Sequence, residues 1–269
     1  MFKLPRIPGR NRMFTILLRT AQRLGPPIVV EVDGLSMELD MRDGLCRGIW
    51  IDRGFAQGRM FTALCRPGDV VIDVGANVGH MALLAARKVG PAGRVVAIEP
   101  GARSYGLLAS NAARNFPDRI DTLRAACDEH DGTATLYVSE YSEEFNSLRP
   151  DTVLGGVHQE TVPARSLGSL CSELEIAPNV VKIDVEGAEW AVLRGLLAGP
   201  QRPPRALLVE AFEPNTRGFG YKPSEMCAWL SGHGYELTLS RETEQWSYSD
   251  ARADGPLLHD VIAIRTGTR

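Results

Sequence analysis

Residues 70–79 read Val-Val-Ile-Asp-Val-Gly-Ala-Asn-Val-Gly, a strand-like apolar run followed at once by a glycine-containing turn. Gly75 allows a ligand to approach the backbone, Asn77 tolerates a positive φ, and Gly79 permits close packing of a following helix. Open α/β sheets bind ligands beyond the carboxyl ends of their strands. The stretch therefore predicts a ligand-binding loop between a buried parallel strand and a helix.

Strands and helices alternate after this loop, which is typical of parallel strands joined by crossover helices. The predicted helices cover 77–88, 102–115, 167–174, 187–197 and 224–231, and the predicted strands cover 70–74, 94–98, 120–125, 180–183, 206–209, 235–239 and 261–264. A polar interval, 128–163, contains another strand at 133–138 and is expected to form a lid or a substrate wall. The fold class predicted is α/β, with a doubly wound, mostly parallel sheet of seven strands.

The residues before this alternation are expected to form an extension, 1–66, on a main domain that covers 67–269. Residues 28–40 alternate apolar and polar side chains on either side of a turn at Asp33, which predicts a β-hairpin. A glycine-rich connector is expected around 44–58.

Six basic residues precede the first acidic one, Glu31, and apolar residues recur at helical spacing between Phe14 and Leu24. This pattern predicts a short basic amphipathic helix. Two interpretations stay open: the helix contacts a membrane surface or a partner, or it packs on its own domain with solvated arginines.

Composition excludes several classes of function. The chain has 269 residues, 44% of them hydrophobic, and a formal net charge of −3, so no global basic field favours nucleic acid as a partner. Five scattered cysteines form no Cys-x-x-Cys pair, and no run approaches the roughly 18 apolar residues of a membrane span. We expect a cytoplasmic protein with reduced thiols, possible membrane contact being peripheral and through the basic helix.

The turn has glycines only at its first and fifth positions, and so lacks the dinucleotide pattern G-x-G-x-x-G. S-adenosylmethionine carries a sulfonium and an ammonium but no phosphate, so a carboxylate such as Asp73 favours that ligand. Glu99 ends the next strand, where a carboxylate accepts ribose hydroxyls. NAD also contains ribose, so an oxidoreductase stays an alternative, and Glu99 has a second interpretation as a partner of the next helix dipole. The expected cofactor-binding residues are Asp73, Gly75, Asn77, Gly79 and Glu99.

A second motif, Val-Lys-Ile-Asp-Val-Glu-Gly-Ala-Glu at 181–189, joins the fourth main strand to a helix. Asp184 ends the strand, and we expect it to act as a base or to orient the substrate. Glu186 is the second candidate catalytic residue, although it and Glu189 also suit the first turns of a helix. A divalent metal bound by Asp184 and another carboxylate is the alternative to direct base catalysis.

Two other residues are ambiguous. His80 follows the glycine turn directly, where it either contacts the cofactor or acts as a base, or simply packs in the fold. Glu210 ends the fifth strand, where it lines the ligand crevice or merely flanks a turn.

These motifs together resemble the FkbM-type methyltransferase family, over roughly residues 67–213. The resemblance rests on DVGANVG, Glu99-Pro100, KIDVEGAE, Asn111 and Asn115, Asn146-Ser147-Leu148 and Leu193-Arg194-Gly195. It implies a class I, Rossmann-like methyltransferase that methylates a hydroxyl on a sugar, polyketide or lipid-type acceptor. In it Asp73, Gly75, Gly79 and Glu99 correspond to cofactor-binding positions, and Asp184 and Glu186 belong to the signature after the fourth strand. Gly168 departs from the family, where similar proteins usually have Asp, and a non-catalytic cofactor-binding scaffold is a further alternative.

Overall fold

The structure is a computed structural model, and it describes residues 27–52, 56–139, 142–153, 157–241, 244–247 and 258–267. The predicted basic helix at 14–24 lies outside these residues.

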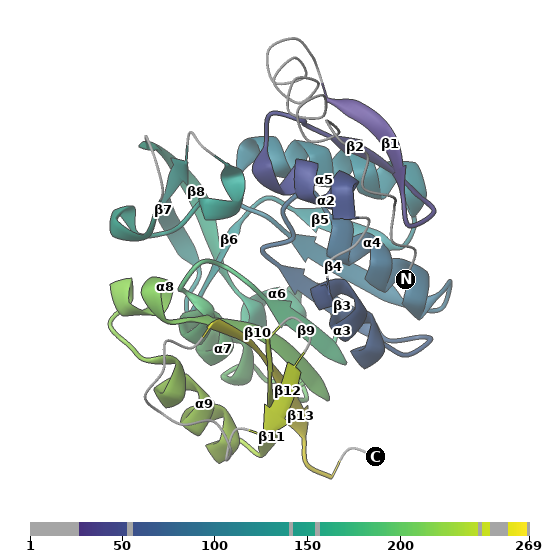
Figure 1. Ribbon diagram of the computed structural model, residues 1–269. Coiled ribbons are helices and arrows are strands. Elements are labelled where there is room, and N and C mark those ends of the chain that lie inside the picture. Colours follow the sequence, from purple (N-terminus) through teal and green to yellow (C-terminus); the bar gives the residue numbers. More distant parts are fainter. Residues whose placement is uncertain are drawn as a thin grey trace.

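A central sheet of eight strands organises the molecule (Figure 1). In spatial order its strands are β12 (Glu244–Ser247), β11 (Tyr235–Arg241), β13 (Leu258–Arg265), β10 (Ala206–Phe212), β9 (Val180–Ile183), β3 (Val70–Val74), β4 (Arg94–Ile98) and β5 (Ile120–Leu123). The five strands from β10 to β5 are mutually parallel, and β13 pairs antiparallel with both β10 and β11. The predicted doubly wound, mostly parallel sheet is confirmed, with β12 added at one edge.

Helices cover both faces of this sheet because its central strands are apolar on both sides. On one face, α4 (His80–Val89) and α5 (Ala102–Asn115) pack against residues such as Val71 and Val95. On the other, α6 (Leu167–Glu173), α7 (Glu189–Leu197) and α9 (Pro223–Gly232) pack against residues such as Ile72 and Val96. A short helix, α8 (Glu213–Gly218), follows β10. These layers place the carboxyl ends of β3, β4, β9 and β10 along one edge.

The predicted polar interval forms a second sheet of three strands, with β8 (Val157–Ser166) between β6 (Ala126–Asp128) and β7 (Gly132–Ser139). The sequence predicted one strand in this interval, at 133–138, and missed β8, a strand of ten residues. Pro163 and the charged residues Glu160 and Arg165 lower its intrinsic strand preference, and its pairing with β7 stabilises the strand instead.

The predicted hairpin is confirmed as β1 (Ile28–Val32) and β2 (Leu35–Leu39), with Asp33 at a φ of 53° in its turn. The predicted connector is instead two helices, α2 (Gly44–Asp52) and α3 (Ala56–Leu64). Glycines conceal these helices in the sequence because they lower helix propensity.

The described part of the extension shares a hydrophobic core with the main domain. Met37, Ile49 and Phe61 are buried in the same cluster as Val71 of β3 and Leu108 of α5. Side-chain amides reinforce this packing: Asn111 Oδ1 accepts the backbone N–H of Glu38, and Asn115 Oδ1 accepts that of Ser36. The extension therefore acts as an integral layer beside α5.

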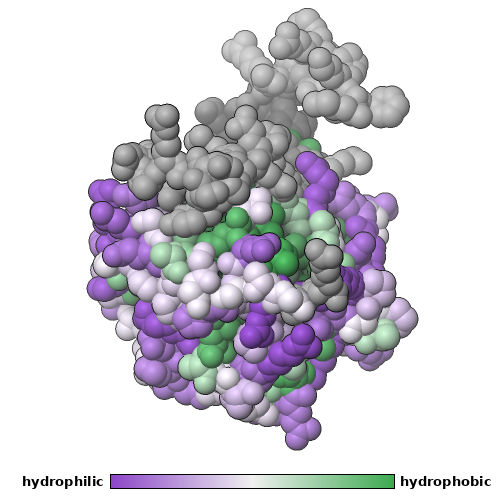
Figure 2. Space-filling model, turned by 90° about the horizontal axis from the view of Figure 1, so that it is seen from below, coloured by the Kyte–Doolittle hydropathy of each residue, from purple (hydrophilic) through white to green (hydrophobic). Residues whose placement is uncertain are grey.

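The surface, the helices and the cysteines bear on two predictions from composition, which were no membrane span and unpaired thiols. Figure 2 shows a face on which polar residues predominate and apolar residues gather in smaller groups. Within the described ranges, every helix falls short of the length and apolar character that crossing a bilayer requires. All five cysteines are free and buried.

Candidate active site

A cavity of about 620 Å³ opens beyond the carboxyl ends of β3, β4, β9 and β10. Its lining includes Gly75, Asn77, Glu99, Asp184, Glu186 and Glu210. The sequence-predicted site residues Gly75, Asn77, Glu99, Asp184 and Glu186 are thus brought to one space, whereas Asp73 and Gly79 lie outside its lining.

The glycine turn is shaped by close backbone contacts. Gly75 has a φ of 72°, and a Cβ on it would lie 1.8 Å from the backbone oxygen of Asp184, so only glycine fits there. Asn77 has a φ of 47°, a left-handed conformation that asparagine tolerates, as the sequence predicted. Gly79, at a φ of 90°, precedes α4, and a Cβ there would lie 2.7 Å from Leu108 Cδ1. The predicted helix start at 77 is therefore corrected to His80, because this turn occupies the residues before it.

Glu99 lies at the carboxyl end of β4 and is 5% exposed. Its Oε2 accepts the backbone N–H of Asn77 and its Oε1 that of Gly101, both at 2.9 Å. Burial raises the pKa of Glu99 to about 7, against the lowering effect of these two N–H donors. The carboxylate is thus fixed between the glycine turn and the start of α5, facing the cavity.

Asp73 is completely buried and does not line the cavity. Its Oδ1 lies 3.4 Å from Nζ of Lys182, which in turn lies 3.3 Å from Oδ2 of Asp184. Burial would lower the pKa of Lys182, but the carboxylates of Asp184 and Asp73 hold it above its ordinary value. Asp73 thus contacts Lys182, which does line the cavity, and its role in cofactor binding stays a prediction.

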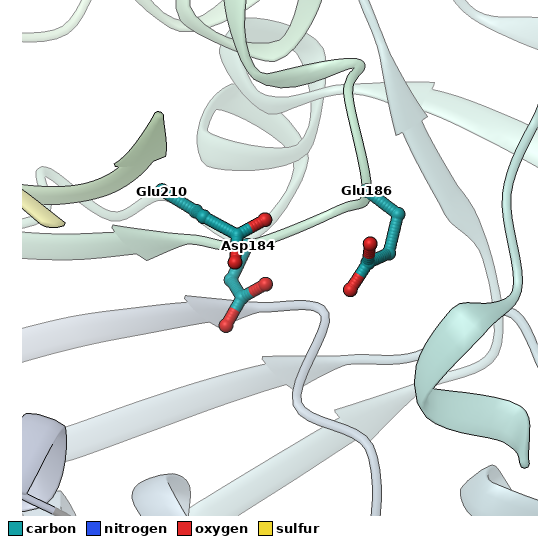
Figure 3. A group of neighbouring side chains, drawn as sticks. All are labelled: Asp184, Glu186 and Glu210. Atoms are coloured by element: carbon teal, nitrogen blue, oxygen red, sulfur yellow. The ribbon is translucent and has the colours of Figure 1, made fainter. Parts of the chain in front are cut away.

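Three carboxylates meet on the other side of the cavity. Each of Asp184, Glu186 and Glu210 has an oxygen within 4.8 Å of the other two, and Figure 3 shows the side chains turned toward a common space. Burial raises the pKa of Glu210 well above its ordinary value, and the charges of Asp184 and Glu186 raise it further. Asn215 Nδ2 donates to Glu186 Oε2 at 2.5 Å and fixes its direction. Such a group can take up a proton, hold a divalent cation or accept hydrogen bonds from hydroxyls.

Asp260 and Lys182 were not among the residues predicted for the site, and Glu210 was predicted either to line the crevice or to flank a turn. Asp260 pairs with Glu210 across β13 and β10, and burial raises its pKa to about 6 although Gln57 Nε2 donates to it at 2.8 Å. The position of Glu210 near the carboxyl end of a predicted parallel strand does indicate a residue that lines the cavity. Asp260 offered none, since it comes from an antiparallel strand whose register only the folded sheet defines.

Glu189 begins α7, where interaction with the helix dipole was expected, but its carboxylate also bonds to the turn before that helix. It is 1% exposed, and its Oε1 accepts the backbone N–H groups of Val185 and Gly187. The hydroxyl of Tyr221 lies 3.0 Å from its Oε2 and 2.9 Å from the Gly187 oxygen. These bonds hold the turn on which Glu186 adopts a φ of 57°.

His80 is 4% exposed at the start of α4, and its Nε2 lies 3.5 Å from Oδ2 of Asp33 in the hairpin turn. Burial lowers the pKa of His80, against the raising effect of Asp33. The imidazole lines the cavity and also joins the extension to the glycine turn.

Apolar residues complete the lining. One group comes from the extension and α4, and another from β7 and the segment after it; they are Leu45, Ile49, Met60 and Met81, and Leu136, Phe145 and Leu148. Gly168 lies elsewhere, where a Cβ would come within 2.7 Å of the Gly195 oxygen and 2.9 Å of the Gly199 Cα. Its departure from the family pattern is therefore a matter of packing between α6 and the end of α7.

Comparison with known proteins finds a matching family model and relatives of moderate sequence identity. The model of the methyltransferase FkbM domain matches residues 73–237. The chain is 30% identical over 233 residues to 31-O-demethyl-FK506 methyltransferase FkbM from Streptomyces tacrolimicus, covering 75% of this chain and 82% of that protein. It is 27% identical over 175 residues to hexuronic acid methyltransferase AglP from Haloferax volcanii, covering 63% and 68%.

Among solved structures, M. jannaschii TYW2 in complex with AdoMet is similar at 12% identity and a TM-score of 0.49, covering 90% of this chain and 87% of that one. The family model spans the sequences DVGANVG and KIDVEGAE and the whole of β4, β5, β9 and β10, with the cavity residues from Val74 to Glu210. The chain therefore belongs to the FkbM methyltransferase family, whose members use S-adenosylmethionine.

Proposed function

We propose that the protein transfers the methyl group of S-adenosylmethionine to a hydroxyl oxygen of a small-molecule, glycan or lipid-type acceptor. The observation that carries this proposal is the division of one cavity into two ends. Glu99 and the glycine turn form one end, and Asp184, Glu186 and Glu210 form the other. The first suits the ribose of the cofactor, and the second suits a hydroxyl that must lose its proton.

The reaction requires alignment and proton removal. The hydroxyl oxygen attacks the methyl carbon in line with the bond to sulfur, that bond breaks, and S-adenosylhomocysteine leaves as a neutral thioether. An aliphatic hydroxyl is a very weak acid, so its proton passes to a carboxylate as the new C–O bond forms. Asp184 is the proposed acceptor, because it follows β9 directly beside β3 and its backbone oxygen lies against Gly75 of the glycine turn.

A divalent metal is the alternative means of activating the hydroxyl. The spacing of Asp184, Glu186 and Glu210 fits oxygen ligands of one cation, which would lower the pKa of a bound hydroxyl. The two mechanisms use the same residues and differ in their dependence on added metal.

The acceptor class is proposed from the lining and from the relatives. The names of two relatives describe one as acting on demethylated FK506 and another as acting on hexuronic acid. In this chain, Leu45, Ile49 and Met60 offer contact with an apolar body, while the three carboxylates offer acceptors to hydroxyls. This combination supports an acceptor with both an apolar part and a polyhydroxylated part.

The rival assignments lose support. An NAD-dependent oxidoreductase does not fit membership of a methyltransferase family or a turn without the dinucleotide glycines. A non-catalytic scaffold would bind the cofactor but leave the carboxylates of the second motif without a chemical task.

The test uses S-adenosylmethionine with an isotope-labelled methyl group and a panel of hexoses, uronic acids and hydroxylated macrolides. Labelled ether on a panel member, identified by mass spectrometry, supports the proposal. Asp184→Asn should then lower single-turnover methylation by roughly 10²–10⁴-fold. Asp121→Asn is the matched control, because Asp121 is exposed on β5 and pairs with Arg94 away from the cavity.

Metal dependence is read in the same assay. Loss of turnover on chelation, restored by Mg²⁺, favours the metal mechanism, whereas chelator-resistant turnover favours direct base catalysis. Cofactor binding with near-normal turnover in Asp184→Asn would contradict both roles for Asp184.

A further inference from the structure

The wall of the cavity beside Glu99 contains an amide group that the site described above does not use. Residues 142–148 follow β7, and among them Glu143, Phe145 and Asn146 line the cavity. Asn146 is 9% exposed, and its Oδ1 accepts the backbone N–H of Ser139 at 3.0 Å. Its Nδ2 is buried and meets no hydrogen-bond partner among the residues that the structure describes.

An unpaired buried donor of this kind costs free energy unless a ligand or water supplies an acceptor. The orientation of the amide is fixed by the bond from Ser139, because only the oxygen can accept that N–H group. The nitrogen must therefore be the group presented on the other side.

The surroundings of this nitrogen are defined by Gly101, the residue before α5. A Cβ on Gly101 would lie 3.0 Å from each of three atoms: Asn146 Nδ2, Glu143 Oε2 and Glu99 Oε1. The two carboxylate oxygens already accept N–H groups at the start of α5, Glu99 that of Gly101 and Glu143 that of Ser104. The amide donor thus lies beside two carboxylates with remaining capacity to accept.

The wall is held in place independently of any ligand. Asp43 Oδ2, from the segment between β2 and α2, accepts the Ser142 hydroxyl at 2.7 Å and the Glu143 backbone N–H at 3.2 Å. Asp43 and Ser142 are both buried. A wall fixed in this way binds a ligand without the cost of ordering a loop.

We propose that Asn146 Nδ2 donates a hydrogen bond to a hydroxyl oxygen of the cofactor's ribose, with Glu143 beside Glu99 as a second carboxylate at the same group. A neighbouring donor and carboxylates match a vicinal diol, because each hydroxyl donates one proton and accepts through its oxygen. A phosphate would accept from Asn146 but would be repelled by both carboxylates. This inference rests on the proposed role of Glu99 as ribose acceptor.

The experiment compares protein and ligand changes in a double-mutant cycle. S-adenosylhomocysteine and its 2′-deoxy and 3′-deoxy forms are titrated by calorimetry into the full chain and into Asn146→Asp. This substitution keeps the acceptor for Ser139 and removes the donor. Asn146→Ala provides a second variant that also lacks the donor but adds no charge.

The expected result is a loss of roughly 10-fold in affinity for S-adenosylhomocysteine in both variants. One deoxy form should lose affinity for the full chain and then show little further loss in the variants. Asn115→Asp is the control: it disturbs the bonds to Ser36 on the hairpin and should lower thermal stability without changing discrimination against the deoxy forms.

Equal losses for all three ligands in both Asn146 variants would overturn the contact with the diol. So would unchanged affinity in either folded variant. If the full chain failed to bind S-adenosylhomocysteine at all, the proposed function would fall first, which distinguishes its failure from that of the Asn146 contact.

Discussion

Lys182 occupies the space between Asp73 and Asp184, where it is 3% exposed. A buried ion pair is weak in net terms, but removing one member leaves an uncompensated charge. Lys182 thereby holds the carboxylate of Asp184 in place through Oδ2, and Asp184 also lines the cavity. The sequence places Asp73 at the right strand end, but which face its side chain takes depends on the packing of α4.

We expect Lys182→Met to lower the free energy of unfolding by about 3–5 kcal/mol at neutral pH. Because burial raises the pKa of Asp73 even beside Lys182, the loss should grow as pH rises above that raised folded-state pKa. It should shrink below it, where folded Asp73 is neutral with or without Lys182. Urea denaturation at several pH values measures this, and adding Asp73→Asn should recover part of the stability. An additive loss in the double variant would contradict the pairing.

Glu99 gives the cofactor site a predicted pH dependence. Ribose hydroxyls that donate to Glu99 favour its ionised form, so binding should lower a pKa that burial has raised to about 7. S-adenosylhomocysteine affinity should therefore fall as pH drops below about 7, with proton release on binding in that range. Calorimetry in two buffers of different ionisation enthalpy measures the proton.

Glu99→Gln should abolish this release. Asp260, whose pKa is raised to about 6, is still present in that variant. Any proton release that remains near pH 6 in Glu99→Gln can therefore be assigned to Asp260. Proton release in Glu99→Gln equal to that of the unmodified chain would assign the effect to another group.

At the scale of elements, the turn between β9 and α7 presents the acidic motif. The Tyr221 hydroxyl on Glu189 stabilises this turn from within the core. Tyr221→Phe should lower methyl transfer by up to about 10²-fold through misplacement of Glu186, while cofactor affinity stays unchanged. Tyr235→Phe removes a comparable buried hydroxyl bond, to Pro204, far from the motif in sequence, and should affect stability alone.

Equal effects of the two tyrosine variants on turnover would contradict a positioning role for Tyr221. The measurement is single-turnover methylation beside thermal unfolding, so that a general loss of stability is separated from a change of rate.

The elements differ in how far the sequence predicts them. The runs at 70–74 and 180–183 are apolar and bounded by turn residues, so the strands and the junctions after them are predictable locally. Residues 157–166, 44–52 and 56–64 lack such a signal, because polar residues, proline and glycine lower their intrinsic preference for a strand or a helix. Their order comes from contacts with β7 and with the core beside α4, which no local pattern specifies.

The same distinction applies to the candidate site. Gly75, Glu99 and Asp184 end strands or begin turns, and parallel strands bring their carboxyl ends to one edge. Asn146 reaches the cavity from the segment after β7, and Asp260 reaches it from the antiparallel strand β13, so their positions depend on tertiary packing.

At the scale of the whole molecule, residues 1–23 are expected to be dispensable for cofactor binding, whereas the hairpin and helices after them pack on the main domain. Deleting residues 1–23 should leave S-adenosylhomocysteine affinity unchanged, since the hairpin begins at Ile28 and, among the described residues, the lining of the cavity begins at Leu45. Calorimetry on chains 1–269 and 24–269 measures this. A large loss of affinity in a folded chain 24–269 would show that the first residues contribute to the site.

The same pair of chains tests the two interpretations of the basic segment. Loss of binding to anionic vesicles in chain 24–269, with neutral vesicles unaffected, would support peripheral membrane contact. Equal vesicle binding by both chains would favour a segment with solvated arginines.

The central claim is that one cavity binds S-adenosylmethionine at its Glu99 end and performs chemistry at its Asp184 end. Titration of S-adenosylhomocysteine into Glu99→Gln and Asp184→Asn tests this most directly. The account predicts a loss of roughly 1.5–3 kcal/mol in binding free energy for Glu99→Gln, the range for hydrogen bonds to a charged group, and little change for Asp184→Asn. Unchanged affinity in folded Glu99→Gln, or a comparable loss in Asp184→Asn, would contradict the division of the cavity.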